Sequence, residues 1–226
     1  MTGFSTPPSY WLSDVKRSAS LLEAYLNHGI FSGAMWDPSA QRRRGIGARD
    51  VIDVEDLFGP TLLSAPIRRS AGKEILERSA SITGHLRAIP IDLTLWYADA
   101  AIVDEGLRHA RALMNELQSI PYIASTRASK LVAAKRPDLV PIWDREVSRA
   151  LGAPRKMPWV EYWAAWRQAL DTELVAKTRQ IAAATSHPCL SPLRVMDIVV
   201  WMDKKGWESL PEGAMWAALR ASHESN

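Results

Sequence analysis

The sequence has little with which to bind a metal ion. Its single cysteine, Cys189, excludes an internal disulfide and a cysteine-rich zinc site, as is usual for proteins of a reducing compartment. The five histidines show neither H-x-x-x-H nor H-x-x-E pairing, so we predict no metal ion and no other cofactor. Cys189 itself, beside a proline, is expected to be a small buried apolar residue.

Long apolar runs and targeting signals are also missing. No apolar stretch approaches the roughly 18 residues that a transmembrane helix needs. The first residues, MTGFSTPPSYWLSD, lack the basic and apolar blocks of a signal peptide. No Walker loop, G-x-G-x-x-G or G-x-S-x-G motif occurs. We therefore expect a cytoplasmic protein that does not interact with membranes.

The hydrophobic pattern predicts an all-α protein. At 226 residues and 47% apolar composition the chain is long enough for a packed core. Apolar residues recur at helical spacing, and no β-alternation extends over more than a few residues. Helices are expected over 14–29, 54–67, 72–89, 99–118, 144–152, 159–185, 191–206 and 211–220, and a short helix is expected after a tight turn at Pro121–Ala124. Ser13 and Asp53 are candidate N-caps, and residues 31–50, rich in glycine and arginine, are expected to form an exposed loop or a short hairpin.

Positive charge is concentrated in one part of the chain. The net charge is only +3, but residues 117–156 contain eight basic and three acidic side chains. Such a cluster is most often a solvated helix face. Its concentration around one loop also favours an edge that faces phosphate.

The segment KRPDLVPIWDREV, residues 135–147, leads to one acidic residue, Asp144. Prolines stiffen this approach, and the residues after Asp144 have a helical pattern. Asp144 can therefore be an ordinary helix N-cap, with Glu146 in the first turn. Alternatively, the loop directs its carboxylate at a substrate. Asp138 is expected to be a solvated turn residue.

The aromatic residues suggest both core and pocket positions. Trp159, Trp163 and Trp166 share one helical face, a pattern typical of helix packing. A pocket wall is proposed for Trp143, Trp96 and Tyr97. Arg194 and Asp197, three residues apart in an apolar helix, are suited to an ion pair that is structural or lines a cleft, and we favour the structural role.

The stretch SIPYIASTRAS, residues 119–129, followed by the Pro-containing loop and an aspartate that opens a helix, resembles the helix–hairpin–helix DNA glycosylases. That superfamily has a Leu-Pro-Gly-Val-Gly turn and a later catalytic aspartate. Ile120 and Pro121 match its Leu-Pro, and Tyr122 and Ala124 replace its two glycines. Asp144 matches the catalytic aspartate. The resemblance covers about residues 117–151.

The resemblance implies an activity and a set of DNA contacts. Asp144 would be catalytic in removing a damaged or modified base from duplex DNA, with the base flipped out. Some members carry a nucleophilic lysine where this chain has Thr126, so a monofunctional enzyme is implied. Lys130 is interpreted as a phosphate or carboxylate partner rather than a nucleophile. The implied DNA-binding residues are Tyr122, Ala124, Thr126, Arg127, Lys130, Lys135 and Arg136.

A second resemblance covers nearly the whole chain. The segments ASKLVAAKRPDLVPIWDREV and LSPLRVMDIVVWM are similar to an uncharacterised bacterial family of about this length, which carries no known activity. Together the resemblances imply an all-α, two-lobed fold of helix–hairpin–helix glycosylase type, with residues 1–49 and 152–226 in one lobe and 50–151 in the other. The activity would serve DNA repair or defence against modified foreign DNA. The alternative is a non-catalytic helical binding module that kept the fold.

Overall fold

A computed structural model describes residues 3–27, 31–37, 45 and 47–206, and every regular element among them is helical. The prediction of an all-α chain is therefore confirmed for these residues. The expected helix over 211–220 lies outside them. The elements are η1 (Pro8–Tyr10), α1 (Val15–Asn27), η2 (Ser32–Met35), α3 (Val54–Leu62), α4 (Arg69–Glu77), α5 (Ser79–Arg87), α6 (Ala100–Gln118), α7 (Ser125–Lys135), α8 (Arg145–Ala150), α9 (Trp159–Ala169), α10 (Thr172–Ala183) and α11 (Pro192–Lys205).

Aspartate caps define several helix starts. Asp53 begins α3 in a reciprocal capping box, because its side chain accepts from the N–H of Asp56 while the Asp56 carboxylate accepts from the N–H of Asp53. Asp99 caps α6. At α1 the prediction of Ser13 as the cap is wrong: Asp14 accepts from the N–H of Arg17, whereas the Ser13 hydroxyl donates to the Tyr10 carbonyl.

Two predicted long helices are each divided in two. Residues 72–89 contribute to α4 and α5, which meet at Arg78, and residues 159–185 form α9 and α10. The second break follows from a local signal, because Asp171 accepts from the N–H of Leu174 and begins α10. The apolar period continues through both breaks, so periodicity alone did not reveal them.

The start of the predicted exposed loop 31–50 is structured. Phe31, Gly33 and Trp36 are buried around η2, so an exposed loop is wrong for this part. A side chain on Gly33 would meet the hydroxyl of Tyr25 at 1.8 Å, which explains why glycine fits there. This turn places Asp37 beside α11.

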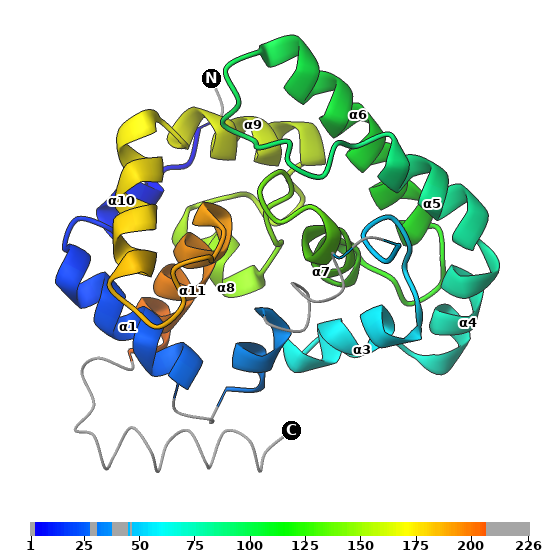
Figure 1. Ribbon diagram of the computed structural model, residues 1–226, viewed down its shortest axis with the longest axis horizontal. Helices are drawn as coiled ribbons and strands as arrows, with labels where there is room; N and C mark the ends of the chain where they lie inside the picture. The colour runs from blue at the N-terminus through cyan, green and yellow to red at the C-terminus, as the bar shows by residue number, and fades with distance from the viewer. Residues whose placement is uncertain (1–2, 28–30, 38–44, 46, 207–226) are drawn as a thin grey trace.

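The helices pack in two groups around one large hydrophobic core, beside which lies a smaller apolar cluster. Figure 1 shows α1, α10 and α11 on one side and α3 to α6 on the other, with α7 and α8 between them. Helix α11 packs against α1, α8 and α10, while α7 packs against α3 and α6. The division into lobes at residues 49 and 152 stays a prediction. None of the described helices is long and apolar enough to cross a membrane.

Candidate functional site

The hairpin between α6 and α7 keeps a left-handed backbone at Tyr122. This residue replaces the first glycine of the resembling turn, yet it has φ 69°, in the region that favours glycine. The ring is exposed, and the Arg68 guanidinium lies 4.2 Å from its centroid. The backbone therefore adopts at Tyr122 the left-handed conformation that glycine favours, although the residue carries a large side chain.

The loop from α7 to α8 is held on both sides. The Ser129 hydroxyl accepts from the N–H of Trp143 at 2.9 Å, which ties the loop to α7. The buried hydroxyl of Tyr162 donates to the carbonyl of Ile142 at 3.0 Å, which ties it to α9. Burial raises the pKa of Tyr162 above its ordinary value, so this donor keeps its proton. The approach to Asp144 is therefore rigid.

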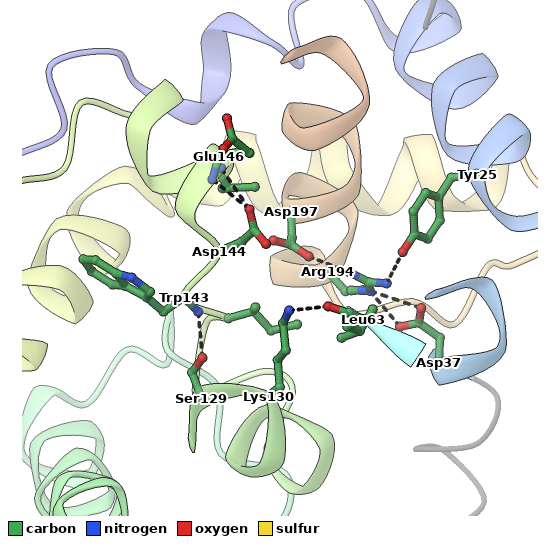
Figure 2. A network of polar contacts seen from close by, with 12 residues as sticks. Tyr25, Asp37, Leu63, Ser129, Lys130, Trp143, Asp144, Glu146, Arg194 and Asp197 are labelled. Atoms are coloured by element: carbon green, nitrogen blue, oxygen red, sulfur yellow. Dashed lines mark hydrogen bonds and ion pairs between the residues drawn. The ribbon is translucent and has the colours of Figure 1, made fainter. Parts of the chain in front are cut away.

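Asp144 caps α8 through a single carboxylate oxygen. Its Oδ1 accepts from the N–H groups of Glu146 at 2.9 Å and Val147 at 3.4 Å. Both bonds use the same oxygen, and the carboxylates of Asp144 and Asp197, which interact electrostatically, point toward one another (Figure 2). Asp144 is therefore an N-cap, as the simpler interpretation expected, and it also lines a cavity.

A buried arginine organises the neighbouring part of α11. Arg194 forms ion pairs with Asp37 at 3.1 Å and Asp197 at 2.5 Å, and donates to the Tyr25 hydroxyl at 3.2 Å. Burial disfavours its charge, but Asp37, Tyr25 and Asp197 together raise the pKa of Arg194. It is a fixed cation that joins α1, α11 and the segment after η2.

Lys130 brings a second cation to the same place. The side chain is buried, and its Nζ donates to the carbonyl of Leu63 at 2.7 Å (Figure 2). Burial lowers the pKa of Lys130, an effect that the nearby charge of Asp144 partly opposes. The lysine is therefore held by a backbone carbonyl and lies within electrostatic range of the Asp144 carboxylate.

Asp197 is the least satisfied group of this cluster. It is 8% exposed, and its Oδ1 has no hydrogen-bond donor among the described residues. Burial, opposed by Arg194 and reinforced by Asp144, raises the pKa of Asp197 to about 6. Buried carboxylate oxygens normally have hydrogen-bond partners, which makes this oxygen the exception within the cluster.

These groups line a cavity of about 550 Å³, within the usual size range of small-molecule sites. Its wall combines three aromatic residues with charged ones, and two cations at its edge, Arg145 and Lys205, are exposed. Tyr25 stacks on Phe31 with centroids 5.0 Å apart, and Trp201 meets Phe31 edge-on. The residues that line it include Tyr25, Phe31, Ser64, Lys130, Asp144, Arg145, Arg194, Asp197, Trp201 and Lys205.

A second cavity, of about 540 Å³, lies on the other side of the Arg194–Asp197 pair. It is lined by Trp36, Asp138, His187 and Cys189, among others. Cys189 is exposed, so the prediction of a buried cysteine is wrong. Among the described residues, no three potential ligands gather closely enough to hold a metal ion.

Three of the implied DNA contacts are buried, Lys130 at the cavity wall and Lys135 and Arg136 in the protein interior. Lys135 is fully buried and pairs with Asp56 at 2.6 Å, and Arg136 is 1% exposed and pairs with Asp50 at 2.5 Å. Neither cation faces a surface that a phosphate can reach, so we remove both from the proposed DNA contacts. The sequence around them predicted a charged edge because amino-acid composition does not distinguish a cation in a buried ion pair from one exposed to solvent.

The other hairpin positions lie at or near the surface. Tyr122 and Ala124 are exposed, while Thr126 and Arg127 are half-buried. Arg127 is engaged with the protein backbone: it donates to the carbonyls of Pro66 at 2.7 Å and Tyr122 at 3.2 Å. Its guanidinium therefore stiffens the hairpin.

The predicted pocket wall is elsewhere. Trp143 packs 4.6 Å from the ring of Tyr162 and 5.7 Å from that of Trp159. It joins the tryptophan face of α9, where Trp163 and Trp166 are buried as predicted. Trp96 packs against the core and Tyr97 is exposed, and none of the three predicted wall residues lines either cavity.

Sequence reasoning missed the aromatic wall and Asp37. Tyr25 lies on the buried face of α1, where an aromatic residue is expected in the core, and Asp37 lies in a segment without helical period. The available signal was the Arg194–Asp197 spacing, because a buried arginine that faces one carboxylate often needs another.

The arrangement combines a carboxylate at a helix start, a second buried carboxylate and two cations at the wall of an aromatic cavity. Neither the curated proteins nor the solved structures include a match to this chain. A family model matches residues 18–204, which contain both carboxylates and both cations. The chain therefore belongs to the Family of unknown function (DUF6308).

Proposed function

We propose that this protein hydrolyses the N-glycosidic bond of a damaged or modified base in DNA and does not cleave the strand. The sequence supports this proposal because residues 119–129, followed by Asp144, resemble the hairpin and the catalytic aspartate of the helix–hairpin–helix DNA glycosylases. The observation that carries the proposal is the placement of Asp144 at a cavity wall, held by a helix through one oxygen only.

The chemistry follows from the charge of Asp144. As the base departs, the sugar becomes positively charged, and a fixed carboxylate stabilises that state and accepts a proton from the attacking water. The backbone N–H groups of Glu146 and Val147 at the start of α8 hold Oδ1 of this carboxylate in place. The rigid loop keeps the group aimed without reorganisation during the reaction.

The cavity suits a flipped base. Base-flipping enzymes place the extruded base between aromatic and apolar side chains, at a cost of roughly a few kcal/mol for unstacking. Phe31 and Trp201 supply such surfaces, and Asp144 lines the same cavity. Damaged or mismatched bases, which are stacked less well, are the substrates that this cost favours.

The exposed cations at the cavity edge predict the salt dependence of DNA binding. Arg145→Gln and Lys205→Gln are each expected to lower the slope of log K against log salt concentration by about 1, because one phosphate contact is lost. Fluorescence anisotropy with a duplex over a salt series measures this. Lys73→Gln, an exposed lysine of α4 paired with Glu77, is the control and should leave the slope unchanged. Equal slopes for all three variants would contradict this edge as the binding face.

A lesion panel tests the activity itself. Duplex oligonucleotides that each carry one altered base are incubated with the protein, and abasic sites are then cleaved with alkali. We expect strand breaks only after alkali treatment, and no covalent adduct when borohydride is present. An adduct would contradict the monofunctional assignment and would identify Lys130 as the amine to test, because it lines the cavity beside Asp144.

The alternative is a helical binding module without catalysis. It predicts DNA binding with the salt dependence given above and no abasic sites with any altered base. The panel and the salt series together therefore separate the two functions.

A further inference from the structure

We propose that Asp197 is the acid partner of Asp144: it carries a proton that it donates to the departing base. This inference rests on the proposed glycosidase activity. Its structural basis is a pair of carboxylates at one cavity wall, contributed by α11 and by the residue before α8 (Figure 2).

The charges around Asp197 favour one added proton. Arg194 on the same helix and Lys130 on α7 are two cations, and they face three carboxylates, Asp37, Asp144 and Asp197. Burial disfavours the charge of Asp197 most, and the neighbouring charge of Asp144 adds to this effect, whereas Arg194 and Lys130 oppose it. Arg145 and Lys205 at the cavity edge are exposed to water, which screens them, and Tyr25 of α1 stays neutral because burial raises its pKa.

Hydrogen bonding places that proton on Asp197. The Oδ1 of Asp144 already accepts hydrogen bonds from two backbone N–H groups. The Oδ2 of Asp197 accepts from Arg194, but its Oδ1 has no donor. A proton on Asp197 removes the repulsion between its negative charge and that of Asp144. The raised pKa of Asp197 is in accord with this assignment.

The step balances with these two groups. The bond between the sugar carbon and the base nitrogen breaks, and its electron pair goes to the base, which takes the proton from Asp197. Water adds to the sugar carbon and gives its proton to Asp144. The products are the protonated base and an abasic sugar with a hydroxyl group. Transfer of the proton from Asp144 to Asp197 then restores the starting state.

The substrate class follows from this role. A neutral base leaves as an anion unless it is protonated, so it needs the acid. A base that already carries a positive charge, such as N7-methylguanine, leaves as a neutral molecule and does not. Asp197 would therefore permit the removal of neutral altered bases.

The first measurement needs no DNA. The full chain is labelled with ¹³C at its aspartate carboxyls, and the resonances are followed by NMR through a pH titration. We expect one carboxyl to titrate near pH 6, to be absent from Asp197→Asn, and to titrate at lower pH in Asp144→Asn, where the neighbouring negative charge is gone. If Asp197 instead titrated at the ordinary aspartate pKa of about 3.9, the proposal that it carries a proton beside Asp144 would be wrong.

The second measurement compares leaving bases. Single-turnover excision is measured on duplexes that carry either hypoxanthine, a neutral base, or N7-methylguanine. Asp197→Asn is expected to slow removal of hypoxanthine by about 10²-fold, in the range of general acid catalysis, and removal of N7-methylguanine by much less. With wild-type protein, hypoxanthine removal should fall as the pH rises through about 6, and this limb should vanish in the variant.

Each outcome decides a different point. Equal losses on both duplexes would reduce Asp197 to a structural role, as would an unchanged pH limb. If the wild type removed N7-methylguanine but not hypoxanthine, the assignment of Asp197 as a general acid would also be wrong. Retained excision of N7-methylguanine by Asp197→Asn shows that the variant is folded. If neither duplex, nor any other of the panel, yields abasic sites, the proposed function fails, and the NMR titration still decides whether the two carboxyls share a proton.

Discussion

Asp144→Asn is expected to lower the rate of base removal by about 10²–10³-fold, the usual cost of losing one fixed electrostatic group from an active site. Asparagine is chosen because it caps helices about as well as aspartate, so α8 should still begin at the same residue. The substitution therefore removes the charge and keeps the structure. Single-turnover excision on the best substrate of the lesion panel gives the rate, and circular dichroism during thermal unfolding checks the fold.

Asp138→Asn is the matched control for this experiment. Asp138 lies in the same loop, its side chain lines the other cavity, and its carbonyl accepts from the N–H of Leu95 at 2.8 Å. The same chemical change six residues earlier should leave the excision rate unchanged. A rate for Asp144→Asn that equals those of the control and the wild type would mean that Asp144 is only a helix cap.

The helical fold was largely predictable because local rules decide it. Apolar spacing identified most of the described helices, and Asp53 caps α3 as predicted. The breaks at Arg78 and Asp171 were missed, since the apolar period runs through both. Periodicity reports which face is buried, and a one- or two-residue interruption of the backbone hardly changes it.

The site was only partly predictable because it is assembled from distant segments. Asp144 was found from its hairpin and loop. Its partners come from α1, α7, α11 and the segment after η2, which no local pattern connects. Lys135 and Arg136 show the opposite failure, because composition cannot distinguish a cation at the surface from one paired in the core. Burial of charge depends on tertiary contacts with Asp56 and Asp50, more than 70 residues earlier in the chain.

Lys135→Met tests this correction and should destabilise the protein by about 3–5 kcal/mol, the range for removing one partner of a buried ion pair. The Lys135 ammonium binds the Asp56 carboxylate at 2.6 Å and the Ala48 carbonyl at 3.1 Å, and the carboxylate is 1% exposed. The substitution leaves the Asp56 charge buried without this cation. Urea unfolding, followed by tryptophan fluorescence, measures the change in the free energy of unfolding.

The double variant Lys135→Met with Asp56→Asn isolates the charge effect. Asparagine can still accept from the N–H of Asp53 in the cap of α3, but it leaves no buried anion, so the double variant should lose less stability than Lys135→Met alone. Lys205→Gln, at the exposed edge of the cavity, should stay within about 0.5 kcal/mol of the wild type. A Lys135→Met protein as stable as the wild type, with a weaker salt dependence of DNA binding, would instead return Lys135 to the DNA-binding surface. The expected loss of stability with an unchanged salt slope makes its charge a requirement of folding, because the α3 cap and the end of α7 are then joined by one buried ion pair.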